Sequence, residues 1–139
     1  MNFSIQKNKL QKALNEHSKV VPIRTTLPIL SCAEFLVTKN ILTITTTDLD
    51  QTIISSIKIE DEQEGKVAIP MIKLVDIITA LQDEKIKITS TEDSVVEINS
   101  QQGVYRITGK SSEDFPETVK PNKNETIVLS GKEYLDIVE

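Results

Sequence analysis

The segment FSIQKNKLQKAL, residues 3–14, carries the pattern that decides the fold. Its first residues alternate as in a β-strand, and Leu10 and Leu14 then follow at the spacing of one helix face. The same pattern returns at residues 67–78 (VAIPMIKLVDII) and at residues 128–139 (VLSGKEYLDIVE), after 64 and then 61 residues. A unit that recurs in this way predicts a repeated structure in which every copy presents equivalent surfaces.

Three more strands are predicted after each strand and helix. In the first half we expect a helix from Asn8 to about Lys19, a connection over 20–27, strands over 28–37, 41–47 and 52–60, and an acidic loop over 61–65. In the second half we expect a strand over 66–69, a helix over 71–81, and strands near 85–89, 94–99 and 104–108. The sequence therefore predicts an α+β fold, an internally duplicated βαβββ unit with two helices packed on antiparallel sheets.

The repeat also sets the expected domain boundaries. Residues 1–120 are predicted to form one domain, with halves of about 1–65 and 66–110 followed by a proline-containing linker. Residues 121–139 are predicted to begin a second domain. Since this third copy ends in mid-helix, and a lone helix of about nine residues is marginal in water, we expect the chain to be a fragment of a longer repeat-built protein.

Composition indicates a globular cytoplasmic protein. The chain has 139 residues, of which 38% are hydrophobic and 27% charged, which suits one domain with a buried core. It contains no run of about 18 apolar residues and no apolar centre of a signal peptide near Met1, so no membrane association is expected. The single cysteine, Cys32, lies in an apolar segment and is predicted to be a reduced, buried thiol.

Charge is segregated along the chain although the formal net charge is −5. Between residues 7 and 24 five basic residues face one acid, whereas residues 60–64 hold four acids and no base. Lys12 and Lys19 fall on the side of the first predicted helix opposite Leu10, and Lys73 falls on the polar side of the second. These lysines either form ordinary solvated faces or add into one basic surface that contacts DNA phosphates without reading bases.

Catalysis is not expected from the residues. Asp48 and Asp50 could hold a hard cation between them, which keeps a metal-dependent enzyme open as an alternative. Aspartate in a turn between two strands is, however, what local hydrogen bonding to the backbone predicts. The only histidine, His17, falls on an apolar helix flank and is predicted to be packed. No glycine-rich phosphate loop is present, and we predict no catalytic residue, cofactor or metal.

Five segments in register carry a family resemblance. The chain resembles the N-terminal domain of the bacterial replicative sliding clamp, the beta subunit of DNA polymerase III. The matching text is Phe3-Ser4 before the first helix, RTTLPILS at 24–31, TDLD at 47–50, VAIP with KLVDII at 67–78, and DFP at 114–116.

This resemblance implies a non-catalytic ring of two subunits through which duplex DNA passes, with helices lining the hole. Such a ring tethers the replicative polymerase for processive synthesis, and its partners are duplex DNA, a second subunit, the polymerase and the clamp loader. Arg24 matches the position of an arginine that reaches DNA, and the longer connection that contains it is absent from the second half. Lys12, Lys19 and Lys73 are further candidates.

The strand at 104–108 is implied to form the subunit seam, with Tyr105 and Ile107 as apolar anchors. Lys73 either contacts DNA or belongs to this seam. Alternation alone is equally compatible with Tyr105 and Ile107 filling the domain's own core. A second alternative function is a protein-binding adaptor that uses this edge strand for β-augmentation.

The resemblance also implies limits for a chain of this length. The pocket that receives polymerase and clamp-loader peptides lies between the second and third domains of the family, and the seam needs the third domain. We therefore expect this chain to be monomeric, to lack peptide binding and to close no ring.

Overall fold

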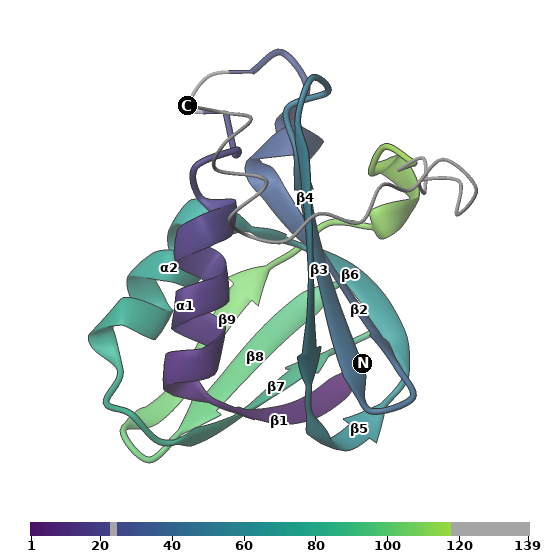
Figure 1. Cartoon of the computed structure of the whole chain (residues 1–139). Helices are drawn as coiled ribbons and strands as arrows, with labels where there is room; N and C mark the ends of the chain where they lie inside the picture. The colour runs from purple at the N-terminus through teal and green to yellow at the C-terminus, as the bar shows by residue number, and fades with distance from the viewer. Residues whose placement is uncertain (23–24, 118–139) are drawn as a thin grey trace, which may run out of the picture.

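The computed structural model describes residues 1–22 and 25–117, and shows two antiparallel sheets with two α-helices in that part of the chain (Figure 1). One sheet has the strand order β5-β1-β7-β8-β9 and the other the order β4-β3-β2-β6. This confirms the predicted α+β class. The elements are β1 Asn2–Gln6, α1 Lys7–His17, β2 Cys32–Thr38, β3 Ile41–Thr47, β4 Thr52–Lys58, β5 Glu60–Gln63, β6 Gly65–Pro70, α2 Met71–Ala80, β7 Lys85–Ser90, β8 Val95–Ser100 and β9 Gly103–Thr108.

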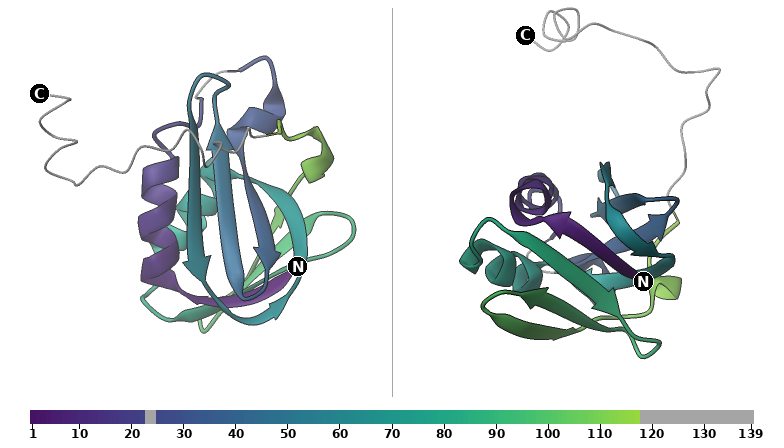
Figure 2. Two further views of the ribbon diagram at one scale, coloured as in Figure 1. Left: turned by 45° about the vertical axis from the view of Figure 1, so that its right-hand side comes forward. Right: turned by 90° about the horizontal axis from the view of Figure 1, so that it is seen from below.

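The two halves exchange their first strands. β1, from the first half, pairs with β7 of the second, and β6, from the second half, pairs with β2 of the first. The sheet of β7, β8 and β9 therefore takes β1 and β5 from the first half, and the sheet of β2, β3 and β4 takes β6 from the second half (Figure 2). Since an unpaired edge leaves backbone donors and acceptors without partners, the duplicated unit forms one interlocked domain rather than two separate ones.

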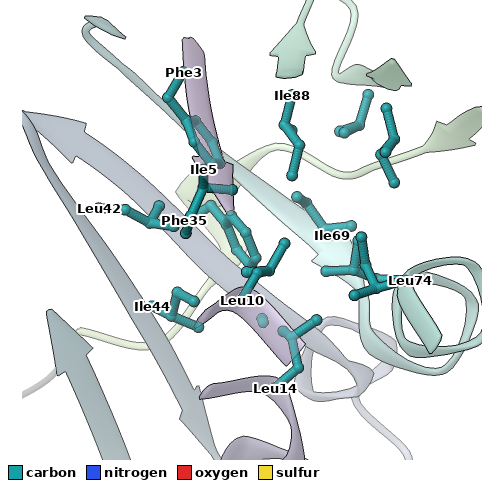
Figure 3. Close-up of a cluster of buried hydrophobic side chains, with 14 of the residues drawn as sticks. Phe3, Ile5, Leu10, Leu14, Phe35, Leu42, Ile44, Ile69, Leu74 and Ile88 are labelled. Atoms are coloured by element: carbon teal, nitrogen blue, oxygen red, sulfur yellow. The ribbon is translucent and has the colours of Figure 1, made fainter. Parts of the chain in front are cut away.

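One hydrophobic core lies between the sheets and the helices (Figure 3). Leu10 of α1 and Leu74 of α2, the repeated positions, are both fully buried. Phe3 and Phe35 come from different sheets and their ring centroids lie 6.5 Å apart. The apolar stripe of each helix therefore covers residues of both sheets, which joins the halves into one core.

The segment predicted as a strand over 28–37 begins as a short 3-10 helix, Pro28–Ser31, and β2 starts only at Cys32. Proline favours a helical first turn because its φ is fixed and it has no N–H to satisfy. The Leu30 N–H then donates to the Leu27 carbonyl at 3.0 Å. The Ser31 hydroxyl donates to the Pro28 carbonyl at 2.6 Å. These local hydrogen bonds hold residues 28–31 in a helical turn, although the sequence pattern predicts a strand there.

The predicted acidic loop is wrong, because Glu60–Gln63 forms the strand β5 and pairs with β1. β7 pairs with one edge of β1, and β5 pairs with the other edge. Tertiary pairing overrides the low strand propensity of glutamate. The acidic composition then suits an edge strand, since charge hinders pairing with another chain.

Helix α1 ends at His17, two residues before the predicted end. The Ser18 N–H donates to the Leu14 carbonyl at 2.9 Å and the Ser18 hydroxyl donates to the Asn15 carbonyl at 2.9 Å, which closes the last turn. Lys19 consequently lies in the following turn and not on the helix.

Cys32 is buried and carries a free thiol, as predicted. Residues 121–139, predicted to begin a second domain, lie outside the described residues. Neither described helix is long and apolar enough to span a bilayer.

Candidate nucleic-acid interface

The helices α1 and α2 lie side by side on the same side of the two sheets (Figures 1 and 2). Each follows its strand directly, so β1 positions α1 and β6 positions α2. The buried stripe of each helix faces the core, which leaves the opposite side of both helices to solvent. Lys12 of α1 and Lys73 of α2, both predicted to contact DNA, are exposed on these two helices.

Helix α1 presents a polar outward side. Lys12 is exposed there, as predicted, with Asn8 and Asn15 beside it. Lys9, one turn earlier, is also exposed. Lys9 belongs to the basic segment 7–24 but was not predicted to contact DNA. Its spacing of three residues from Lys12 already indicates that the two lysines are neighbours on one helix face.

Lys73 lies on the flank of α2 that points away from α1. The opposite flank of α2 faces the connection that follows α1, because Ile72 and Val75 line an apolar groove together with Ser18 and Pro22 of that connection. A helix turns about 100° per residue, so Lys73 is rotated past the outward side and away from this groove. The lysines of the two helices are therefore separated by exposed Ile72 and do not merge into one continuous patch.

Arg24, the strongest DNA-contact candidate, lies outside the described residues. The nearest described residues are Pro22, which lines the apolar groove, and Thr25, whose hydroxyl accepts a hydrogen bond from the Leu27 N–H at 3.0 Å.

His17 fixes the C-terminal end of α1 to two strands. The side chain is fully buried, and its Nδ1 lies 2.7 Å from Thr46 Oγ1 of β3 while its Nε2 lies 2.8 Å from Ser55 Oγ of β4. Burial lowers the pKa of His17, and the nearby Glu16 carboxylate opposes this shift to a lesser degree. His17 therefore orients the helix that carries Lys9 and Lys12, which agrees with the predicted packed histidine.

Asp48 shapes a turn. Its Oδ1 accepts hydrogen bonds from the backbone N–H groups of Asp50, at 2.9 Å, and of Gln51, at 2.6 Å. Leu49 between the two aspartates has a φ of 80°, a left-handed conformation that this bonding holds in place. Among the described residues no three His, Cys, Asp or Glu side chains converge as a metal site would need. The contacts of Asp48 are those of the turn interpretation.

The strand β9 is a free edge of its sheet within the described residues. Ile107 is only 3% exposed and belongs to the core, and Tyr105 is partly buried against the same core. The two residues thus point inward, in the orientation of the core alternative. The side chains that β9 offers to solvent include Val104, 57% exposed, and Arg106, which pairs with Glu97 at 2.9 Å. The role of Tyr105 and Ile107 in a subunit seam stays a prediction.

Sequence and structure comparisons agree with this arrangement. The family model of the DNA polymerase III beta subunit, N-terminal domain, matches residues 1–120. The chain belongs to this clamp family. A beta sliding clamp from Vibrio harveyi is 32% identical over 117 residues, covering 84% of this chain and 81% of that sequence. One from Vibrio cholerae is 28% identical over 140 residues, covering 100% of this chain and 38% of that sequence.

Solved clamps share the fold. The crystal structure of the DNA polymerase III beta subunit from Pseudomonas aeruginosa superposes with a TM-score of 0.82 at 30% identity, covering 87% of this chain and 33% of that one. A Helicobacter pylori beta clamp bound to a DNA ligase peptide gives a TM-score of 0.81 at 25% identity, covering 88% and 34%. The chain thus spans about a third of the length of these two clamps.

Proposed function

We propose that residues 1–120 act as the N-terminal domain of a DNA sliding clamp. The observation that carries the proposal is the family match over these residues, on a fold that presents the helices α1 and α2 together on one side. In this role the domain catalyses no reaction and needs no cofactor. It contributes one segment of a ring around duplex DNA, and the ring tethers the replicative polymerase in the cytoplasm.

The partners follow from the same proposal. Duplex DNA would lie against the outward sides of the helices, while a second clamp subunit, the polymerase and the clamp loader would engage the assembled ring. The Helicobacter pylori clamp was crystallised with a DNA ligase peptide, which supports peptide-bearing partners for the family. Residues 121–139 would lead into the next clamp domain.

The chemistry of holding DNA without gripping a sequence suits long cationic side chains. Contacts from lysine and arginine to phosphates, direct or through water, give each position along a duplex nearly the same energy. Sliding then meets no deep energy wells. Retention would come from the closed ring, so the domain itself is expected to bind DNA weakly.

The proposed contact residues divide between two surfaces. We assign Arg24, Lys12 and Lys19 to DNA. Lys73 lies on the flank of α2 away from α1, so we assign it to the subunit seam along β9, with Tyr105 and Ile107 supporting that edge from the inner side.

The test is a titration of the chain into a fluorescently labelled duplex, followed by anisotropy at several salt concentrations. We expect weak binding that does not depend on sequence, with log K falling linearly against log salt. Arg24→Ala should weaken binding to every duplex alike and reduce the magnitude of the salt slope by about 0.9, the value of one phosphate contact. Binding that ignores salt, or that selects one sequence, would overturn the proposal.

A matched control uses Lys66→Ala. Lys66 is exposed on β6 and lines a polar hollow with Glu34 and Glu113, apart from the residues of both helices. Its loss removes the same kind of charge from another surface, so it should leave the salt slope unchanged.

The free edge of β9 favours a protein-binding adaptor as a second candidate. An extended partner would add a strand there by backbone hydrogen bonding. Val104→Glu places a charge on the exposed side of this edge without entering the core. Self-association or partner binding that Val104→Glu removes, together with DNA binding that Arg24→Ala leaves intact, would favour the adaptor.

A further inference from the structure

The segment that follows β9 passes from one sheet to the other. The Gly109 N–H donates to the Ser94 carbonyl, just before β8, at 2.8 Å. Lys110 then exchanges two backbone hydrogen bonds with Ala68 of β6, at 2.8 and 3.0 Å. The 3-10 turn Ser112–Asp114 lies beside β6, on the side of the molecule away from α1 and α2 (Figure 1). Residues 109–117, here called the strap, therefore connect the two sheets.

The strap covers the outer face of the sheet that contains β2 and β6. Alternate residues of β2 such as Phe35 belong to the central core, so Cys32 and Glu34 point to the opposite face. Glu34 lines a hollow of about 450 Å³ there together with Phe115 of the strap. Cys32 is fully buried on this face, which raises the pKa of its thiol, and the nearby positive charge of Lys110 opposes this shift. The strap therefore contributes to the burial of the thiol.

One buried side chain and a few backbone hydrogen bonds hold the strap in place. Phe115, 6% exposed, is the only buried residue of the strap, and it lies outside the central core. The hollow beside it is lined by three carboxylates and one ammonium group, those of Glu34, Glu113, Glu117 and Lys66. Repulsion between these carboxylates weakens the contact between the strap and the sheet. Because segments with few buried apolar contacts open at a lower free energy than the core, the strap is the weaker part of this fold.

A close approach of backbone at Gly109 sets where the strap crosses between the sheets. A Cβ atom at this position would lie 2.6 Å from the Ser94 carbonyl oxygen and 2.8 Å from the Ala68 carbonyl oxygen. Both distances are too short for a nonbonded contact, so a residue with a Cβ atom must displace the strap or its partners. Gly109 therefore offers a second way to weaken the closed strap, one that leaves Phe115 unchanged.

We propose that the strap opens as one unit while both sheets stay folded, and that Cys32 becomes accessible to solvent in the open form. In the closed form the chain is anchored as far as Phe115, beside the sheet that contains β6. In the open form the last anchored residue is Thr108, at the end of β9 in the other sheet. Opening therefore adds residues 109–117 to the tether that leads to the rest of the chain, up to about 30 Å when extended.

The consequence for a clamp rests on the proposed function. If residues 121–139 begin the next domain, a longer tether lets that domain change its position relative to this one. The strap would then be a hinge that is closed by Phe115 and by the backbone bonds at Gly109 and Lys110. Opening itself needs neither DNA nor a second domain, so it can be tested apart from the clamp role.

The test follows the reaction of Cys32, the only cysteine of the chain, with the aromatic disulfide dithionitrobenzoate at constant pH. The Cys32 thiolate attacks the disulfide, forms a mixed disulfide with one half of the reagent and releases the other half as a coloured thiolate. In the intact chain we expect slow labelling whose rate hardly changes in low urea, because opening the strap exposes little surface. Phe115→Ala should raise the rate about 10- to 100-fold, the factor for loss of one buried aromatic side chain. Gly109→Ala should raise the rate as well.

Leu10→Ala is the matched control, because it weakens the central core and leaves the strap unchanged. It should label at the rate of the intact chain without urea, since only global unfolding becomes easier. If Leu10→Ala speeds labelling as much as Phe115→Ala does, or if Phe115→Ala labels no faster than the intact chain, the strap proposal is wrong. A labelling rate of the intact chain that rises with urea as steeply as global unfolding would also overturn it.

The outcomes keep the two proposals apart. If the intact chain does not bind duplex DNA even at low salt in the anisotropy titration, the clamp role fails, and the labelling rates still decide whether the strap opens. If the chain binds DNA while Cys32 reacts only through global unfolding, the clamp role survives and the strap is a fixed part of the domain.

Discussion

The two halves of the domain have the same topology but differ in the surfaces of their helices. Offset by 64 residues, Leu10 and Leu74 are both fully buried, so the inner sides are equivalent. The outer sides are equivalent only in part, since the exposed Lys9 has the exposed Lys73 as its counterpart, whereas Lys12 corresponds to Asp76 and Asn8 corresponds to Ile72, which is 63% exposed. The inner positions are constrained by one shared core, and the outer ones have been free to differ.

The connections after the helices differ as well. The second half reaches β7 through only four residues, 81–84, whereas the first half uses residues 18–31 before β2 begins. That longer connection includes the 3-10 helix and the position of Arg24. The difference teaches that the first half carries the added charge and the added loop, while the second half mainly completes the sheets.

Both halves depend on the same hydrophobic core, so substitutions in it should have the largest effect on the free energy of unfolding. Leu10→Ala and Leu74→Ala should each lower the free energy of unfolding by about 2–5 kcal/mol, because each leaves a cavity in the same packed core. Urea unfolding followed by circular dichroism should show one transition for both variants, shifted by similar amounts.

Ile72→Ala is the control for this pair. It removes an aliphatic side chain from α2 at an exposed position, so the free energy of unfolding should change by less than about 0.5 kcal/mol. Two separate transitions in either core variant would contradict the interlocked domain, because they would mean that one half unfolds while the other persists.

Local periodicity explains how much of this architecture could be predicted. The spacing of Leu10 and Leu14, and its return at Leu74, was enough to predict both helices and the duplicated βαβββ order. The exchange of β1 and β6 between sheets was not predictable, because pairing between residues distant in sequence leaves no local pattern. The strand β5 was missed for the same reason, since β1 supplies its pairing.

The candidate site was only partly accessible to the same reasoning. Exposure of Lys12 followed from helix geometry, and so did burial of His17. The hollow that Lys9, Lys12 and Ser55 line depends on where β4 lies against α1, and this packing of distant segments leaves no local pattern in the sequence. The alternation of Tyr105 and Ile107 fixed that they share a face, but alternation cannot say which face meets the core.

His17 marks the sharpest difference between the buried sides of the two halves. Its counterpart at the 64-residue offset is Leu81, which is buried without a polar group. His17→Leu should therefore mimic the second half yet cost about 1–3 kcal/mol of unfolding free energy, because the hydroxyls of Thr46 and Ser55 lose their partner. Chemical denaturation measures this loss.

Rescue separates hydrogen bonding from shape in that variant. Adding Thr46→Val and Ser55→Ala to His17→Leu removes the unsatisfied hydroxyls, so much of the lost stability should return. If the triple variant is as unstable as the single one, packing of the imidazole rather than its hydrogen bonds holds α1 in place.

The pH dependence of stability is a smaller consequence of the same buried imidazole. Burial lowers the pKa of His17 below its ordinary value of 6.5, so the unfolded chain takes up the proton at a higher pH than the folded chain does. Protonation thus favours the unfolded state. The contribution of neutral His17 is fully present above pH 6.5 and is lost as the pH falls below it toward the folded-state pKa, by at most about 1.4 kcal/mol per pH unit.

The comparison with His17→Gln isolates this effect, because glutamine keeps hydrogen-bonding atoms but does not titrate. Glu34 acts in the opposite direction, since burial raises its pKa and acidification then favours the folded state, and Glu34 is present in both proteins. Urea unfolding from about pH 7.5 to about pH 5.5 should therefore show a steeper loss of stability in the intact chain than in His17→Gln. Parallel curves would mean that His17 is protonated as readily in the folded domain as in the unfolded chain, and that the first half tolerates a charge where the second half buries Leu81.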